Sequence, residues 1–231
     1  MEPDPVGQIL LIDADDTLWE NNIYYERVIR NAVSLLDGAG VDPGVFRAAL
    51  DDAERMRIPL QGYGTVNFTH SLVETFRRFQ PPDAGPALAE RVRQMSLAIR
   101  DHPMEIIETV PETLAYLADR HALYLVTKGN REEQSRKVRD SMLQDYFQSV
   151  EILPEKDTLA FSRLLDRHGW EHSRTWMIGN SPRSDINPAL AVGISAVYIP
   201  HRHTWTFEQE HPLDHPRLII LERFSDLRQH F

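Results

Sequence analysis

The stretch QILLIDADDTLW, residues 8–19, decides how the rest of this chain is interpreted. Its apolar part, residues 9–12, is typical of a strand buried on both faces of a parallel sheet. Asp13, Asp15 and Asp16 follow at once, and carboxylates belong just past the carboxyl end of such a strand, where open α/β sheets bind ligands. An extended backbone places Asp13 and Asp15 on the same side. Their mutual repulsion predicts a hard cation, most simply Mg2+, although a solvated turn is the alternative for an isolated pair.

Composition indicates an ordinary, acidic globular protein. The 231 residues are 42% hydrophobic and 26% charged, which allows one large domain or a core with a smaller insert. The net charge of -10 argues against nucleic acid as a partner. No apolar stretch is long enough to span a membrane, and residues 1–5 lack a signal-peptide pattern. The absence of cysteine excludes disulfides and a cysteine nucleophile, so we expect a cytoplasmic protein.

A long helical stretch follows the acidic strand end. Apolar residues at helical spacing predict helices over 23–36, 45–56, 68–79 and 88–99. Residues 59–65, which contain Gly62-Tyr63-Gly64, are predicted to form a loop. Four helices without an intervening strand predict a compact helical domain over residues 22–100.

Helix and strand alternate after residue 103. Strands are predicted at 122–126, 148–153, 175–178 and 195–199, with an edge strand at 218–221. Such alternation implies a parallel sheet with right-handed crossovers. The predicted fold class is therefore α/β: a doubly wound, Rossmann-like parallel-sheet core in residues 1–21 and 101–231, with the four-helix domain inserted at 22–100.

Polar residues also follow the later strands. Thr127 ends one predicted strand, Lys156 lies just beyond the next, and GNSPRSD occupies residues 179–185 after a third. A hydroxyl at this sheet edge, supplemented by backbone N–H groups of Lys128 and Gly129, suits an anionic oxygen. A lysine beside a helix start opposes the helix dipole, and a functional site can explain such a departure.

These segments resemble the motifs of the haloacid dehalogenase (HAD) superfamily of hydrolases. DADDTL at 13–18 is similar to the first motif, and Thr127, Lys156 and residues 179–185 are similar to the later ones, in the same order. The resemblance implies a phosphatase-type enzyme with a helical cap between the first and second motifs. Its expected reaction is Mg2+-dependent hydrolysis of a small phosphorylated metabolite.

The resemblance also implies a role for each motif residue. Asp13 would attack phosphorus and form an aspartyl-phosphate, and Asp15 would act as general acid and then general base. Thr127 and Lys156 would hold the equatorial oxygens of the phosphoryl group. The implied Mg2+ ligands are Asp13, the Asp15 backbone carbonyl and Asp185.

The last motif departs from the family pattern at one position. Asn180 stands where an aspartate is often found, so one formal charge is missing. An amide oxygen can still bind Mg2+ or one of its waters, but less strongly than a carboxylate. Ser181 and Arg183 are further polar candidates near the site.

Other functions fit the same resemblance. Haloacid dehalogenases share the aspartate nucleophile but lack the second aspartate and need no metal, so Asp15 favours a phosphatase. A phosphonatase would need a cap lysine, and residues 22–100 contain none. A phosphomutase shares both aspartates and remains an alternative. A non-catalytic phosphate-binding protein is disfavoured because the motif set is intact.

The sequence says less about substrate specificity and oligomeric state. Tyr63 is the candidate specificity residue of the cap, with an ordinary interhelical turn as the alternative. His201 and His203 alternate after the last clear strand, and without a third ligand nearby we expect loop residues. The basic residues on the helix after Asn130 are expected to form a solvated face. The predicted partner is a small phosphate ester, and the oligomeric state is not predicted.

Overall fold

The computed structural model describes residues 7–36, 38 and 40–231; residues 1–6, which include the segment without a signal-peptide pattern, lie outside this description. The chain divides into two compact units. One runs to Asn22 and resumes at Met104–Phe231, and the other is Ile23–Pro103. We call them the core unit and the helical unit. Within the described ranges, none of the helices has both the length and the apolar character that crossing a bilayer requires.

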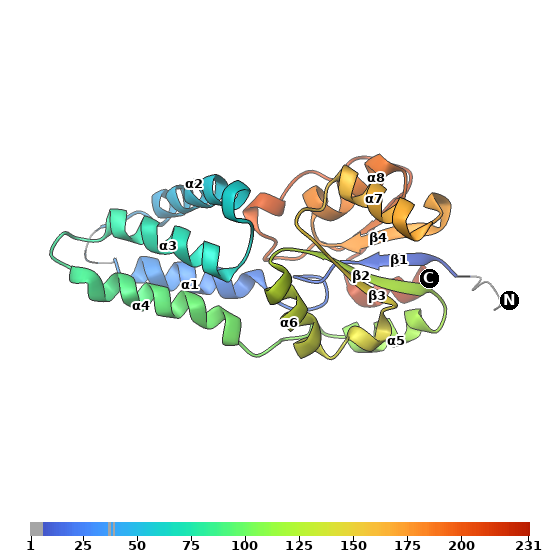
Figure 1. The fold of residues 1–231 in the computed structure, drawn as a ribbon, viewed down its shortest axis with the longest axis horizontal. Helices are drawn as coiled ribbons and strands as arrows, with labels where there is room; N and C mark the ends of the chain where they lie inside the picture. Colours follow the sequence, from blue (N-terminus) through green and yellow to red (C-terminus); the bar gives the residue numbers. More distant parts are fainter. Residues whose placement is uncertain (1–6, 37, 39) are drawn as a thin grey trace. The chain divides into compact units, whose positions relative to one another are not determined.

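The core unit contains a six-stranded sheet in which every pairing is parallel (Figure 1). The strand order is β3-β2-β1-β4-β5-β6, so the chain starts in the middle of the sheet and extends it in both directions. The strands are β1 (Ile9–Ile12), β2 (Ala122–Lys128), β3 (Ser149–Leu153), β4 (Thr175–Gly179), β5 (Ser195–Tyr198) and β6 (Leu218–Ile220). The predicted α/β class with a doubly wound parallel sheet is confirmed.

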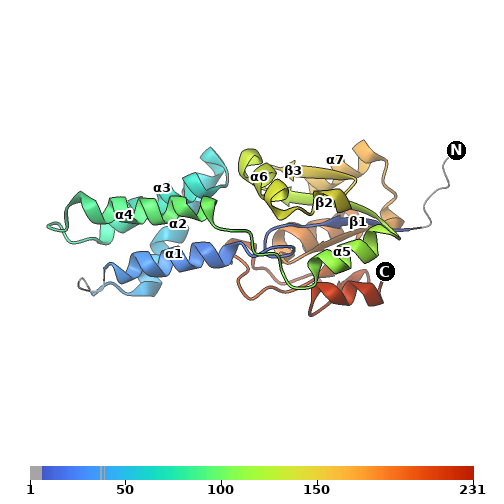
Figure 2. The same ribbon diagram turned by 90° about the horizontal axis from the view of Figure 1, so that it is seen from below.

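Alternation of side chains along β1 explains why helices cover both faces of the sheet. Leu10 and Ile12 pack into one apolar cluster with α5 (Val110–Ala118). Leu11 packs into the opposite cluster with α7 (Thr158–His168). Figures 1 and 2 show α5 and α7 on opposite sides of the sheet. The remaining core helices are α6 (Arg131–Ser141) and α8 (Asn187–Val192).

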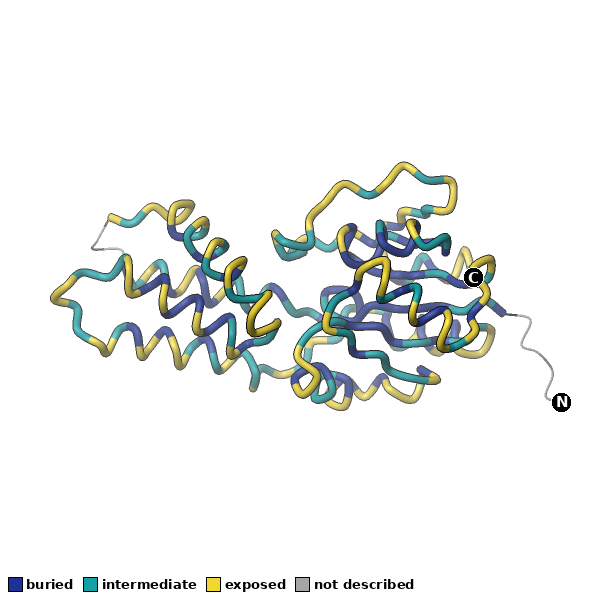
Figure 3. The backbone as a smooth tube through the Cα atoms, turned by 45° about the horizontal axis from the view of Figure 1, so that its top comes forward, coloured by how far each residue is buried: buried dark blue, intermediate teal, exposed yellow. Residues whose placement is uncertain are grey.

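The helical unit is built from four amphipathic helices. They are α1 (Asn22–Ser34), α2 (Pro43–Gln61), α3 (Thr65–Phe79) and α4 (Gly85–Leu97). Their apolar faces form one cluster that includes Phe46, Leu72 and Phe76, all fully buried. The burial pattern repeats along each helix, with buried and exposed residues on opposite sides (Figure 3).

Several predicted boundaries differ from the structure by a few residues, and the differences in α2 and β2 have a clear physical cause. Helix α2 continues through Pro59 to Gln61, where a loop was predicted, because proline removes one helical hydrogen bond without preventing the last turn. The Gly62 N–H closes that turn on the Ile58 carbonyl, 2.8 Å away. Strand β2 extends to Lys128, since Thr127 and Lys128 still pair with β3.

Candidate active site

Three parallel strands end together at one edge of the core sheet. Ile12, the last residue of β1, pairs with Leu125 of β2 and Ile178 of β4. Asp13 follows directly, and its N–H donates to the Ile178 carbonyl at 2.9 Å. Thr127 lies in the last part of β2, two residues beyond the partner of Ile12, and both Thr127 and Asp13 are buried. The carboxyl edge of the sheet is where such folds place their ligands.

Lys156 connects two of the acidic residues. Its Nζ lies 2.5 Å from Asp13 Oδ1 and 2.5 Å from Asp185 Oδ1, and it also donates to the Val126 carbonyl at 3.4 Å. All three charged side chains are at least nine-tenths buried. The lysine that the sequence placed beside a helix start is thus directed into the sheet edge.

This group holds two carboxylates against one ammonium. Burial raises the pKa of Asp13, and burial together with the charge of Asp13 raises the pKa of Asp185 to about 7. The two carboxylates raise the pKa of Lys156 despite its burial, so it stays charged. Two buried carboxylates with a single net negative charge are a donor set that suits a divalent cation with oxygen ligands.

Asp185 is held in place by a tight turn after β4. Pro182–Ile186 form a π-helical turn, and the Ser181 N–H donates to Asp185 Oδ2 at 3.0 Å. A Cβ at Gly179 would lie 2.2 Å from the same oxygen, so only glycine leaves room for this carboxylate. Such π-turns often occur at functional sites.

Asn180 is specified as an amide by its neighbours. Its Nδ2 donates to Thr204 Oγ1 at 3.0 Å, and the Thr204 hydroxyl donates its own hydrogen to the His201 carbonyl at 2.9 Å. The Thr204 oxygen can therefore only accept from position 180. On the other side, Thr17 Oγ1 lies 3.0 Å from Asp13 Oδ2 and 3.3 Å from Asn180 Oδ1. Asn180 thus lies beside Asp13, as its predicted metal-ligand role requires.

Asp15 has a separate set of partners. Lys137 Nζ lies 2.9 Å from both carboxylate oxygens, Trp19 Nε1 donates to Oδ1 at 2.7 Å, and Gln134 Nε2 donates to Oδ2 at 2.9 Å. These donors, Lys137 foremost, lower the pKa of Asp15 against the effect of burial. The interpretation of the basic residues on α6 as a solvated face was therefore wrong for Lys137. The sequence shows that Gln134 and Lys137 share one face of a helix, but it does not show that Asp15 lies opposite that face.

Lys128 and Gly129, both predicted to bind substrate, have partners within the core unit. Lys128 Nζ donates to Glu155, Ser184 and Glu208 at 3.1, 2.8 and 2.5 Å. Glu208 also accepts from Ser181, and Lys128 keeps its pKa low. The Gly129 N–H donates to the Leu153 carbonyl at 3.0 Å, so in this structure the amide belongs to the sheet. Sequence reasoning missed Glu208, which lies in the short 3-10 helix Thr206–Glu208.

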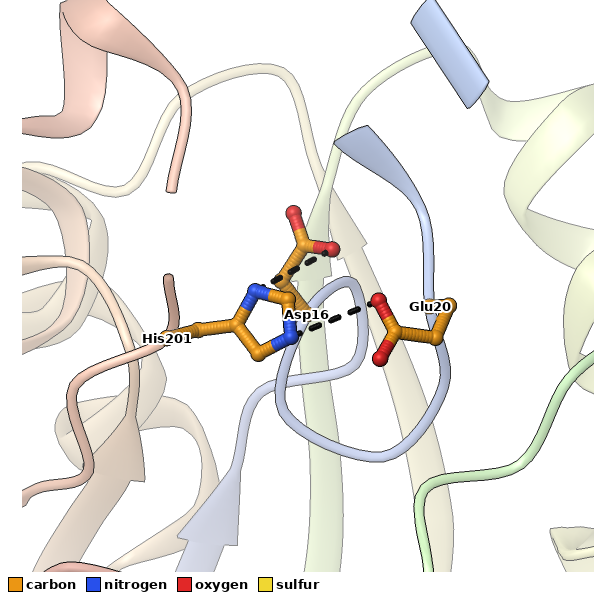
Figure 4. Close-up of side chains that lie close together, drawn as sticks. All are labelled: Asp16, Glu20 and His201. Carbon is orange, nitrogen blue, oxygen red and sulfur yellow. Dashed lines mark ion pairs between the residues drawn. The ribbon is translucent and has the colours of Figure 1, made fainter. Parts of the chain in front are cut away.

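His201 lies in a loop, as predicted, but two acidic side chains lie near it, which the sequence did not show. Its Nδ1 lies 3.7 Å from Asp16 and its Nε2 lies 3.4 Å from Glu20 (Figure 4). One ligand atom from each of the three lies within 4.8 Å of the others, a spacing that a cation could use. Both Asp16 oxygens, however, already accept backbone N–H groups of Asn21 and Asn22 at 2.9 to 3.2 Å. Asp16 is thus a loop-closing residue at the start of α1, and its burial raises its pKa to about 7.

A groove of about 590 Å³ lies in the helical unit, and none of its lining residues belongs to a motif. Two of its arginines are ion-paired: Arg57 with Glu74 at 2.7 Å and Arg93 with Glu90 at 2.6 Å. Paired arginines on an exposed helix surface are ordinary solvated groups, so we place no chemistry there. Tyr63 lies in the same unit, in the turn between α2 and α3, and remains a predicted specificity residue.

The chain belongs to the haloacid dehalogenase-like hydrolases, because the model of that family matches residues 8–193. It is similar over 100% of its length to a haloacid dehalogenase-like family hydrolase from Xanthomonas campestris, with 30% identity, 92% of that chain covered and a TM-score of 0.86. Its fold is also that of the 2-haloacid dehalogenase from Pseudomonas syringae (21% identity, 97% of both chains, TM-score 0.59). The magnesium-bound HAD-hydrolase YfnB from Bacillus subtilis shares the fold as well (16% identity, 97% and 98% covered, TM-score 0.64). Among curated proteins, none matches the chain.

Proposed function

We propose that this hydrolase is a phosphatase that cleaves small phosphate monoesters through an aspartyl-phosphate on Asp13. The observation that carries the proposal is the half-buried carboxylate of Asp15 beside that nucleophile, both of whose oxygens accept hydrogen bonds. Phosphate ester hydrolysis needs such a second carboxylate as acid and base, because the departing alcohol takes up a proton. A halide ion leaves without a proton. The alternative of a dehalogenase, which the 2-haloacid dehalogenase from Pseudomonas syringae suggests, gives Asp15 and its donors no task.

The reaction proceeds in two displacements. An Asp13 oxygen attacks phosphorus and the ester P–O bond breaks. Asp15 must enter this step protonated, against the donors that lower its pKa, and it gives that proton to the departing alcohol. Asp15 then takes a proton from water, whose oxygen attacks the aspartyl-phosphate and releases inorganic phosphate and free Asp13. Lys156 faces Asp13 with its positive charge, and Thr127 offers a hydroxyl at the neighbouring strand end. Both would hold phosphoryl oxygens, as positioning and electrostatics dominate this chemistry.

Asp13, the Asp15 carbonyl, Asp185 and Asn180 would hold Mg2+, which when bound offsets the repulsion between carboxylate and phosphate. The shared ammonium and the raised pKa of Asp185 are what support this donor set. The helical unit would act as the cap, with Tyr63 contributing to substrate choice. A cytoplasmic location remains a proposal that agrees with the absence of cysteine.

The test measures p-nitrophenyl phosphate hydrolysis with Mg2+ and with EDTA, and chloride release from 2-chloropropionate in parallel. We expect phosphate release that needs Mg2+ and falls by about 10⁴-fold or more in Asp13→Asn and by about 10²-fold or more in Asp15→Asn. Asp140→Asn, an exposed position on α6, is the matched control. Chloride release that depends on Asp13 but not on Asp15 or Mg2+ would instead identify a dehalogenase.

A further inference from the structure

Asp15 is the most heavily hydrogen-bonded carboxylate among the motif residues. Lys137 lies 2.9 Å from both of its oxygens, and Trp19 and Gln134 each donate to one of them. Two of these three donors come from α6, more than a hundred residues away along the chain. The carboxylate therefore has one defined position, and α6 sets it.

Local structure on α6 is arranged for these contacts. Residues 134 and 137 are three apart, so they lie on one face of the helix. The Asn130 side chain accepts the N–H groups of Glu132 and Glu133 and fixes where the helix begins. A Cβ at Gly129 would come within 3.1 Å of Gln134 Nε2, so glycine lets that amide reach past the strand end. Lys137 also donates to Asn21 Oδ1 at 2.7 Å, which fixes its ammonium from a second side.

The distribution of lysine singles out this contact. The chain has 25 basic residues but only three lysines, Lys128, Lys137 and Lys156. Each is paired with acidic groups at the sheet edge: Lys156 with Asp13 and Asp185, Lys128 with Glu208, and Lys137 with Asp15. Lys137 is thus the lysine directed at the acid–base carboxylate.

We propose that Lys137, with Gln134, is a positioning residue that aims the Asp15 carboxylate at the leaving-group oxygen; this inference rests on the proposed phosphatase function. Proton transfer requires heavy atoms within hydrogen-bond distance, and a displacement of about 1 Å can cost about 10²-fold. The need for a proton grows as the leaving group becomes a poorer one. A displaced Asp15 carboxylate therefore slows the hydrolysis of esters of weakly acidic alcohols more than the hydrolysis of activated esters.

The experiment compares p-nitrophenyl phosphate with phenyl phosphate, which differ in leaving group but little in shape. It uses the Mg2+-loaded full-length enzyme and its variants Lys137→Met, Lys137→Arg and Gln134→Leu. Arg139→Met is the control, because it removes a positive charge from an exposed position of the same helix. For Lys137→Met we expect kcat to fall by about 10-fold or less on the nitrophenyl ester and by about 100-fold on the phenyl ester, with KM within about threefold. Lys137→Arg should recover most of the loss, since a guanidinium can bridge both oxygens.

The outcomes distinguish the positioning role of Lys137 from the phosphatase function on which it rests. Gln134→Leu should show the same selective loss on the phenyl ester, which keeps the test valid if Lys137→Met folds poorly. Equal losses on the two esters, or a change confined to KM, would overturn the positioning role while leaving the phosphatase function intact. A wild-type enzyme that hydrolyses neither ester, yet releases chloride from 2-chloropropionate, would overturn both.

Discussion

Lys156 Nζ lies 2.5 Å from Asp185 Oδ1, and the two side chains are only 2% and 0% exposed. The same ammonium lies 2.5 Å from Asp13 Oδ1. Burying charges this deeply costs free energy, and the ammonium and the two carboxylates offset this cost for one another. The electrostatics of the sheet edge therefore depend on one lysine.

Replacing Lys156 with methionine should destabilise the metal-free protein by about 3–5 kcal/mol, because two buried carboxylates lose their cation. Lys156 lowers the pKa of Asp185, which is about 7 in the wild type, so this pKa should be higher in the variant. The loss should therefore grow as pH rises above about 7, where the variant continues to lose stability and the wild type does not. Urea unfolding in EDTA measures the effect, and Arg139→Met is the control. If Mg2+ binds here, it should raise the Tm of the variant more than that of the wild type. A loss below about 1 kcal/mol would show that Lys156 does not hold this group together.

Gly179→Ala should disrupt the site without altering any polar group. The new Cβ would lie 2.2 Å from Asp185 Oδ2, and that carboxylate cannot move away because Lys156 and the Ser181 N–H hold it. We expect a stability loss of about 1–3 kcal/mol and a fall in turnover of at least about tenfold. Gly38→Ala, where an added Cβ meets nothing within 4 Å, serves as the control. Wild-type turnover in Gly179→Ala would contradict the assigned role of Asp185.

Asn180→Asp tests why this chain has an amide in the last motif. The new carboxylate would face the Thr204 oxygen, whose hydrogen is already given to the His201 carbonyl. We expect a stability loss of about 1–3 kcal/mol without metal and tighter Mg2+ binding, since carboxylates bind this ion better than amides do. Calorimetric Mg2+ titration and thermal melts measure the two effects. Thr204→Val, which removes the same hydrogen bond, should lower stability without strengthening Mg2+ binding; equal Mg2+ affinity in Asn180→Asp and wild type would exclude position 180 as a ligand.

Glu54 predicts a pH-dependent stability in the helical unit. Burial raises its pKa to about 8, so the folded protein keeps a proton that the unfolded chain releases near its ordinary pKa of 4.5. The stability that this proton provides is complete below about pH 4.5 and is lost as pH rises through 8. Glu54→Gln should therefore match the wild type at pH 5 and exceed its unfolding free energy by about 1–3 kcal/mol at pH 9. Denaturant unfolding at both pH values measures the gap, with exposed Asp52→Asn as control; a gap independent of pH would show that Glu54 is ionised in the folded protein.

The fold and the motif positions could be read from the sequence because they depend on local patterns. Residues 9–12 are continuously apolar and the next residue is Asp13, so both the strand and the position of its carboxylate follow from chain direction alone. Asp42 and Asn130 are residue types that commonly begin helices, and their side chains accept N–H groups at the starts of α2 and α6. Local patterns failed at Pro59, where the helix continues for one more turn that the Gly62 N–H closes on the Ile58 carbonyl.

The partners of the motif residues could not be read in this way. Lys137 lies 122 residues from Asp15 in the chain, and nothing in the periodicity of α6 distinguishes its solvated positions from the one that faces a carboxylate. His201 lies in a loop and Glu208 ends the short 3-10 helix Thr206–Glu208, and segments this short carry no periodic signal. The lysine composition was the one available indication, since three lysines among 25 basic residues are an unusually small set.

By itself the sequence determined the α/β class, the strand that carries Asp13 and the order of the motifs, because hydrophobic period and chain polarity act over a few neighbouring residues. Only the tertiary structure decided which cation faces which carboxylate. Lys156 reaches Asp13 across 143 residues of sequence and Lys137 reaches Asp15 across 122. Such pairings arise when parallel strands end at a common edge, and they are set by distance in space, which no local pattern records.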